Sequence, residues 1–196
     1  MFKDKRSKKV ILVCHCVLNQ NAKLDQCAHY PGAIREVAEL LVSGEAGIIQ
    51  LPCPELLYLG LDRQADQSAS PTVASEDTRI AKRMGEDKAR ELCRKIACET
   101  VYQIEEYRKN GFEVTGLIGI NGSPTCGVET TWADGADVDG PGIFIRLLGE
   151  ELAKRNISFN MAGIRANNPQ SAARAVKKYM QEINSFFGKF GGGSSV

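Results

Sequence analysis

Three of the seven cysteines in this sequence stand in short motifs that restrict the backbone around them. Cys16 opens the stretch CVLNQNAKLD, Cys53 lies between two prolines in PCPE, and Cys126 precedes a glycine in SPTCG. Proline fixes its own φ angle and holds the preceding residue extended, so a thiol in such a motif is aimed before any ligand arrives. Three thiolates around one point are typical ligands of zinc, cuprous copper or an iron-sulfur cluster.

Each of these cysteines follows a segment that we predict to be a buried strand. The segments 9–14, 47–51 and 113–120 are short runs rich in Val, Ile and Leu, which indicates strands covered on both faces. If they are neighbours in the order second, first, third, which right-handed crossovers permit, adjacent strand ends lie about 4.8 Å apart. Inward-curling loops would then bring the three sulfurs into one site at the carboxyl edge, where open α/β sheets bind ligands.

Strand-like runs alternate with amphipathic helical segments along the whole chain. This alternation predicts an α/β fold: a single-domain, open parallel sheet of about four strands with helices on both faces, Rossmann-like and three-layered. The fourth strand is expected over 158–164, and the helices over 32–43, 76–109, 141–155 and 169–187. We expect one α/β domain over 1–187 and a disordered tail over 188–196.

Two long connections follow strands, over 52–75 and 121–140. Connections of this length are unusual in a compact domain and are often functional, and both would lie at the carboxyl edge of the sheet. Trp132, Asp134, Asp137 and Asp139 fall in the second connection. They could form a lid over a substrate or a solvated acidic loop.

Composition and charge narrow the class of protein. With 196 residues, of which 43% are hydrophobic and 25% charged, the chain is expected to form a globular domain with one sizeable core. A formal net charge of +1 argues against electrostatic capture of nucleic acid or a membrane surface. No stretch approaches the roughly 20 apolar residues of a membrane span. An odd number of cysteines in a chain of this size favours a reducing cytoplasm, and the chain could be a monomer or a homodimer.

Two polar residues lie close to the cysteine motifs. Glu55 is two residues after Cys53 and could act as a general base over the site, or it could be a carboxylate at a helix start. Ser123 could orient a water molecule or donate to a substrate, or it could serve as a turn residue ahead of Pro124.

The remaining cysteines and the two histidines are predicted to be structural. His15 and His29 could each supply a base or a fourth ligand, but a satisfied structural histidine is the expected role. Of the other cysteines, Cys14 is expected in the core and Cys27 at the rim of the site without a role. Cys93 and Cys98 are expected to take part in helix packing.

The three cysteine motifs occur in the same order as those of the DUF523 family of thiouracil desulfurases, which are related to TudS, and the sequence resembles that family over residues 14–127. The family pattern is a Cys-Leu-Leu-Gly start with a later Arg-Tyr-Asp, then Cys-Pro-Glu, then Ser-Pro-Ser-Cys-Gly. In the first motif Asn19 replaces glycine and Ala22 replaces a cysteine. Lys23-Leu24 replace Arg-Tyr, so the resemblance leaves the thiolated substrate open.

The resemblance implies that the protein is an enzyme, a 4Fe-4S-dependent desulfurase. Cys16, Cys53 and Cys126 would hold the cluster, and its free iron would take the sulfur of a small thiocarbonyl compound such as a thiouracil. Glu55 and Ser123 match the catalytic positions proposed for the family. The expected reaction is hydrolytic, with release of hydrogen sulfide.

Two alternatives stay open from the residues themselves. The three cysteines, with His15 or His29, could form a structural zinc site or a thiol-redox module without desulfurase activity. Alternatively, Cys126 could be a lone nucleophile with a histidine base, as in acyl-transfer enzymes.

Overall fold

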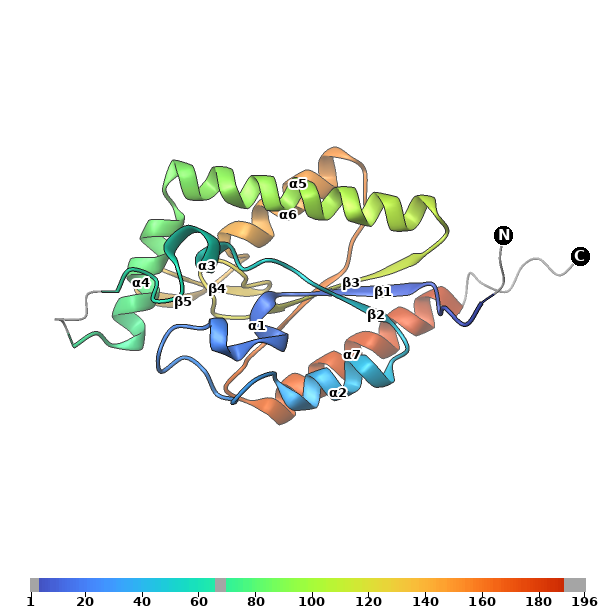
Figure 1. The fold of residues 1–196 in the computed structure, drawn as a ribbon, viewed down its shortest axis with the longest axis horizontal. Helices are drawn as coiled ribbons and strands as arrows, with labels where there is room; N and C mark the ends of the chain where they lie inside the picture. Colours follow the sequence, from blue (N-terminus) through green and yellow to red (C-terminus); the bar gives the residue numbers. More distant parts are fainter. Residues whose placement is uncertain (1–3, 66–69, 189–196) are drawn as a thin grey trace, which may run out of the picture.

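The computed structural model describes residues 4–65 and 70–188, with backbone alone for 183–188. Its centre is a parallel sheet in the order β2-β1-β3-β6 (Figure 1). The strands are β1 (Lys9–Val13), β2 (Gly47–Gln50), β3 (Glu113–Ile120) and β6 (Met161–Ile164). The neighbour order predicted for the first three strands is confirmed, since β1 pairs in parallel with both β2 and β3.

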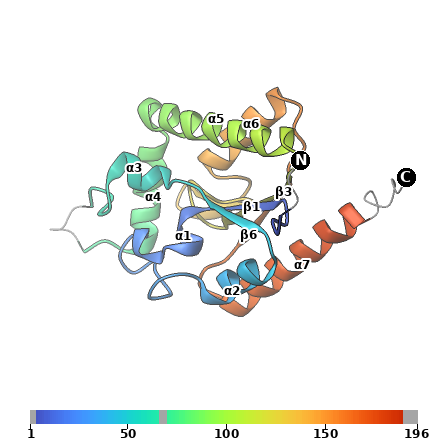
Figure 2. The same ribbon diagram turned by 45° about the vertical axis from the view of Figure 1, so that its right-hand side comes forward.

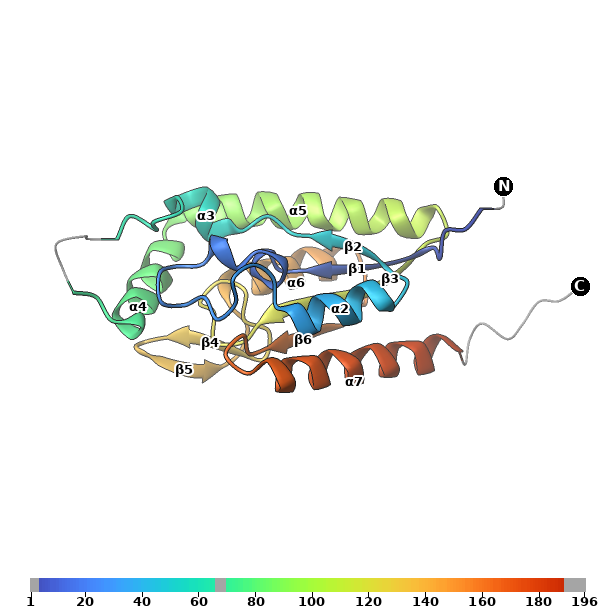
Figure 3. The same cartoon turned by 60° about the horizontal axis from the view of Figure 1, so that its bottom comes forward.

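Helices cover both faces of this sheet, which confirms the predicted three-layer α/β class. One face carries α5 and α6 and the other carries α2 and α7, as Figures 1 and 3 show. Their bounds are α2 (Arg35–Ser43), α5 (Asp87–Lys109), α6 (Ile143–Lys154) and α7 (Pro169–Gly188). The two central strands are therefore enclosed on both sides, and Ile11, Leu12, Leu117 and Ile118 are buried in the core.

The connection after β2 is more ordered than predicted. It contains the short helix α3 (Pro54–Leu59), and the single helix expected over 76–109 is instead α4 (Val73–Met84) followed by α5. Gly85 ends α4 by donating its N–H to the carbonyl oxygen of Ala81 at 3.1 Å, and the extended Glu86 then starts α5. Glycine is the poorest helix former after proline, so the break falls where helix propensity is lowest.

The connection after β3 was also predicted as a structureless loop, and this was wrong. It contains an antiparallel hairpin formed by β4 (Thr130–Ala133) and β5 (Ala136–Asp139). Asp134 and Gly135 form its turn with positive φ angles of 51° and 81°, a conformation that an Asp-Gly pair favours in hairpins.

Several predicted element ends move by a few residues. The helix expected from Pro141 begins at Ile143, because Gly142 is tied to the preceding loop through its N–H to the Gly127 carbonyl at 3.0 Å. Likewise α2 begins at Arg35 and β6 at Met161. Asn168 caps α7, since its Oδ1 accepts the N–H of Ser171 at 3.0 Å. The predicted tail lies outside the described residues except for Gly188, the last residue of α7.

The two ends of the sheet differ in what covers them. The carboxyl ends of the strands meet α1 (His15–Leu18), α3, α4 and the β4–β5 hairpin, whereas the described start of the chain lies at the opposite end (Figures 1 and 2). Within the described residues, no helix is both long and apolar enough to cross a membrane.

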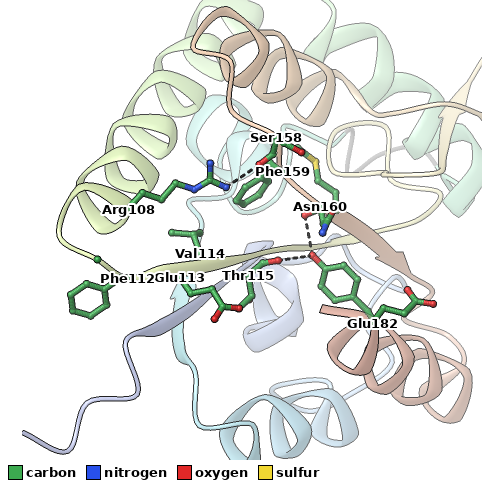
Figure 4. Close-up of a pocket in the computed structure, with 12 residues that line it drawn as sticks. Arg108, Phe112, Glu113, Val114, Thr115, Ser158, Phe159, Asn160 and Glu182 are labelled. Atoms are coloured by element: carbon green, nitrogen blue, oxygen red, sulfur yellow. Dashed lines mark hydrogen bonds between the residues drawn. The ribbon is translucent and has the colours of Figure 1, made fainter. Parts of the chain in front are cut away.

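A hollow of about 940 Å³ lies at the amino end of the sheet (Figure 4). The hydroxyl of Tyr179 donates to the Asn160 carbonyl at 3.0 Å, and Arg108 Nη2 donates to the Ser158 carbonyl at 2.9 Å. None of the five predicted site residues lines this hollow, so its size alone does not make it the candidate site.

Candidate functional site

The three strands that precede the predicted ligands end side by side. Val13 of β1 is in register with Gln50 of β2 and with Ile118 of β3. Cys16 lies three residues after Val13, and Cys53 lies three residues after Gln50. Parallel pairing therefore delivers both thiols to the same edge of the sheet, as the sequence predicted.

Cys53 is held by the prolines on either side of it. It adopts an extended conformation, with φ −84° and ψ 111°, and Pro54 is the first residue of α3. The Leu56 N–H donates to Cys53 Sγ at 3.5 Å. Burial, the charge of Glu55 and that of Cys126 raise the pKa of Cys53 to about 12. The expectation that prolines fix this thiol in place is confirmed.

Cys126 reaches the sheet edge through a loop that folds back on β3. The N–H of Ile120 donates to the carbonyl oxygen of Cys126 at 3.0 Å. Ser123 Oγ accepts the N–H groups of Thr125 at 3.2 Å and of Cys126 at 3.0 Å. A hydrogen bond with Cys14 and burial raise the pKa of the Cys126 thiol. The turn role considered for Ser123 is therefore present in the structure.

Cys16 lies on the short helix α1 rather than in a loop. Its carbonyl accepts a hydrogen bond from Gln20 Nε2 at 2.6 Å, which fixes the start of the chain segment that leads to Ala22. Burial raises the pKa of the Cys16 thiol, and the nearby thiolate forms of Cys126 and Cys53 raise it further. The charged forms of Cys53 and Cys126 therefore act on the Cys16 thiol.

One cavity of about 450 Å³, called the thiol pocket below, collects all five predicted site residues. Its lining includes Cys16, Cys53, Glu55, Ser123 and Cys126. They come from α1, from the start of α3 and from the loop after β3. The sequence analysis thus identified the core of one pocket at the carboxyl edge.

Glu55 lies in the first turn of α3 and is tied to a buried arginine. Its Oε2 is 3.4 Å from the Nε of Arg63, and the two side chains are 17% and 2% exposed. The guanidinium also lowers the pKa of the neighbouring Cys53 and Cys126, against the raising effects of burial. Arg63 is a site residue that the sequence analysis missed, because a single charged residue in a predicted loop gives no sign of burial.

Three further charged residues that line the thiol pocket were also missed. They are Lys23, Asp77 and Arg165. Burial raises the pKa of Asp77 to about 6, and the charge of Glu55 contributes to this increase. Asp77 therefore provides the pocket with a carboxyl group whose proton affinity is suited to exchange near neutral pH. Asp77 reaches the thiol pocket because α4 packs over the strand ends, and the sequence pattern did not predict that packing.

The β4–β5 hairpin forms one wall of the thiol pocket. Trp132 and Asp137 line it, whereas Asp134 and Asp139 are not among the lining residues. Trp132 Nε1 donates to Thr78 Oγ1 at 3.0 Å, which ties the hairpin to α4. Asp137 forms an ion pair with Arg165. Part of the connection over 121–140 therefore lies at the thiol pocket.

The other cysteines and the histidines lie as follows. Cys14 and Cys93 are buried in the core, and Cys98 is half-buried on α5. Cys27 and His29 line the thiol pocket. His15 is not among its lining residues, and its Nε2 lies 3.3 Å from Asn19 Nδ2.

The donor set of the thiol pocket fits an iron-sulfur cluster. All seven cysteines lie in the described part of the chain and are free thiols. Among the described residues, no group of three or more His, Cys, Asp or Glu side chains is arranged to hold a metal ion. Cys16, Cys53 and Cys126 line one cavity, and cysteine thiolate is the ligand type that iron-sulfur clusters take in proteins. Cys16, Cys53 and Cys126 are the residues that would hold it.

Comparison with known proteins identifies one similar chain, which is an uncharacterised protein, MJ0003, of the archaeon Methanocaldococcus jannaschii. The two sequences are 37% identical over 123 residues, which cover 63% of this chain and 70% of that protein. No family model matches the sequence. No solved structure matches it either.

Proposed function

This chain belongs to the same family as the uncharacterised archaeal protein MJ0003, and we propose that it is an iron-sulfur-dependent desulfurase acting on a small thiocarbonyl compound. The observation that carries the proposal is the thiol pocket itself. It combines the thiols of Cys16, Cys53 and Cys126 with the carboxylate of Glu55 and the hydroxyl of Ser123 in one cavity of about 450 Å³. The motif resemblance to the DUF523 thiouracil desulfurases supports the same activity.

The cofactor is a 4Fe-4S cluster held by Cys16, Cys53 and Cys126. When bound, such a cluster supplies one iron without a protein ligand, which acts as a Lewis acid toward a substrate sulfur. The three thiols lose their protons on binding, because the thiolate is the metal ligand. The working compartment in this proposal is a reducing cytoplasm, where cysteines are kept as thiols.

Glu55 is the general base in this proposal. Its carboxylate removes a proton from a water molecule as the water oxygen forms a bond to the thiocarbonyl carbon. The contact between Arg63 Nε and Glu55 Oε2, at 3.4 Å, orients the carboxylate and leaves it partly open to the pocket. The first turn of α3 keeps Glu55 beside Cys53, so the base and the ligand move as one unit.

Ser123 donates a hydrogen bond to the attacking water or to the substrate. Its Oγ already accepts the N–H groups of Thr125 and Cys126, and a hydroxyl has one hydrogen to donate. With both acceptor contacts made on the loop side, that hydrogen is available to the pocket. The same interactions fix the position of Cys126, so Ser123 combines a structural and a chemical role.

The overall reaction is balanced without an external electron donor. Water supplies the oxygen of the new carbonyl group, the carbon–sulfur bond breaks, and the two water protons leave with sulfur as hydrogen sulfide. A small substrate matches a cavity of about 450 Å³.

The test is anaerobic purification and reconstitution, followed by iron and acid-labile sulfide analysis and by sulfide-release assays. Thiolated pyrimidines and thioamides are the substrates to assay. The expected result is a brown protein with about four irons and four sulfides per chain that releases sulfide only with a thiocarbonyl compound. A colourless protein that binds one zinc ion would contradict the proposal.

Matched cysteine variants sharpen this test. Cys16→Ala, Cys53→Ala and Cys126→Ala should each lose both the colour and the turnover, whereas Cys98→Ala should keep both, because Cys98 does not line the thiol pocket. If Cys126 alone were needed for activity, the protein would instead be a cysteine nucleophile enzyme.

A further inference from the structure

Arg63 is a buried arginine in the wall of the thiol pocket, with 1% of its surface exposed. Its Nη1 donates to the carbonyl oxygens of Gly60 at 2.7 Å and of Leu61 at 3.1 Å. Its Nη2 donates to the carbonyl oxygen of Ala22 at 2.5 Å. The guanidinium therefore connects the loop after α3 to the chain segment that follows Cys16.

The same guanidinium faces two of the predicted site residues. Arg63 Nη2 lies 3.7 Å from Cys53 Sγ, and Nε lies 3.4 Å from Glu55 Oε2. A close charge-assisted pair between nitrogen and oxygen measures about 2.7–2.9 Å, so the contact with Glu55 is a loose one. Among the described residues, Glu55 is the one carboxylate that forms an ion pair with Arg63.

The charge of this buried group is only loosely paired by the protein. Carbonyl oxygens satisfy N–H groups of Arg63 but do not neutralise its charge, and Glu55, its ion-pair partner, lies at 3.4 Å, whereas a buried charge is stabilised by a close and well-hydrogen-bonded counter-ion. Three thiolates and the cluster that they hold would supply negative charge beside the guanidinium. The cation is therefore best explained as one half of an electrostatic pair that is completed by the ligand.

The backbone at this position is also held against its own preference. Arg63 and Gln64 have φ angles of 55° and 54°, a left-handed conformation that is unfavourable for residues other than glycine. Such a conformation persists where the surroundings hold it. Around Arg63 the guanidinium is hydrogen-bonded to Gly60, Leu61 and Ala22.

We propose that Arg63 is the buried counter-charge of the cysteine-bound cluster and the positioning residue that keeps Cys53 and Glu55 in place. This inference rests on the proposed desulfurase function, since it concerns the same pocket. It assigns to Arg63 no contact with the reacting atoms. The two roles can be separated by experiment. The counter-charge role needs only a positive charge, whereas the positioning role needs the planar set of donors of the guanidinium.

The experiment compares Arg63→Gln, Arg63→Lys and the control Arg155→Gln. Arg155 also pairs with a glutamate, Glu151, at 3.1 Å, but it does not line the thiol pocket. Each protein is reconstituted anaerobically and assayed for bound iron and sulfide, for iron loss to a chelator and for the reduction potential of the cluster. The melting temperature is also measured with and without the cluster, and kcat and KM are determined separately.

We expect Arg63→Gln to bind the cluster about 10–100-fold more weakly, the usual effect of removing a group that supports metal ligands. Its residual cluster should have a more negative reduction potential, because a nearby positive charge favours the reduced form. The gain in melting temperature on cluster binding should shrink as well. Arg63→Lys should retain the potential but lose kcat, because one ammonium cannot hold both Cys53 and Glu55.

Outcomes that overturn the inference differ from those that overturn the function. A wild-type protein that takes up no cluster removes both. The inference alone fails if the wild type binds the cluster and Arg63→Gln shows the same iron retention, the same reduction potential of the cluster and the same gain in melting temperature on cluster binding. A role limited to folding would lower the melting temperature of the cluster-free protein and leave the gain on cluster binding intact, so Arg63 would then be structural.

Discussion

The N–H of Ile120 donates a hydrogen bond to the carbonyl oxygen of Cys126 at 3.0 Å, so the loop that leaves β3 returns to the end of the same strand. Cys126 is six residues further along the chain but lies at the strand end. This backbone contact, rather than sequence proximity, places the third thiol beside the other two. The close approach of the loop to β3 depends on the absence of a side chain at Gly119.

Gly119→Ala should displace the loop that carries Cys126. A Cβ at this position would lie 2.7 Å from the Cys126 carbonyl oxygen and 2.6 Å from a Val128 methyl group. We expect a loss of about 1–3 kcal/mol in the free energy of unfolding, as for other overpacked cores, and weaker binding of iron. Denaturant unfolding and iron analysis measure both effects. Gly149→Ala on α6 is the control, since its Cβ meets no heavy atom within 4 Å; equal losses in the two variants would contradict the explanation.

Ser123→Ala should separate the two roles of this side chain. It removes the acceptor for the N–H groups of Thr125 and Cys126, and the loss of a comparable cap costs about 0.5–2 kcal/mol. Ser123→Thr retains the hydroxyl and should recover most of that stability. Thermal unfolding combined with the sulfide-release assay is the measurement. A Ser123→Ala variant with full turnover would show that the hydroxyl has no part in the chemistry.

Asp77→Asn should change how stability depends on pH. Burial, Glu55 on α3 and Glu76 on its own helix raise the pKa of Asp77 from 3.8 to about 6, while Lys23 lowers it. The folded protein therefore binds more protons at Asp77 than the unfolded chain does between these two pH values, and the wild type loses stability as the pH rises through that window. The neutral asparagine lacks this cost.

The measurement is the difference in melting temperature between Asp77→Asn and the wild type at several pH values. We expect the difference to shift in favour of the variant from about pH 4 to pH 7 and then to stay level. Asp62→Asn is a suitable control, because Asp62 is exposed and does not line the thiol pocket. A difference that is constant across this range would contradict the assignment of a raised pKa to Asp77.

Trp132→Phe should loosen the hairpin wall of the thiol pocket. The variant loses the hydrogen bond from Trp132 Nε1 to Thr78 Oγ1, an interaction with a net value of about 0.5–1.5 kcal/mol. If the hairpin helps to enclose the substrate, KM should rise several-fold with a smaller change in kcat. Thr78→Val removes the same bond but retains the indole ring. A rise in KM in Trp132→Phe alone would indicate ring contact with the substrate instead of anchoring of the hairpin.

Much of the architecture could be predicted from the sequence. The runs at 9–14, 47–51 and 113–120 match β1, β2 and β3 closely, because fully buried parallel strands are almost continuously apolar. The thiols at the carboxyl edge followed from the same pattern, since each comes after a strand. The Asp134-Gly135 pair was a local signal for the hairpin, and reading 121–140 as one loop overlooked it.

What the sequence could not determine is the charge environment of the thiol pocket. Arg63, Asp77 and Arg165 come from three separate segments and resemble ordinary surface residues along the chain. Burial and charge pairing depend on distances between segments, and local patterns of hydrophobicity do not encode those distances. The sequence by itself determined the first three strands and the end of each strand at which its thiol lies, whereas the neighbour order of the strands was a condition that the observed pairing meets. Only the tertiary structure decided which charges face those thiols, because α4, the hairpin and the loop after α3 acquire a shared pocket only when they pack over the strand ends.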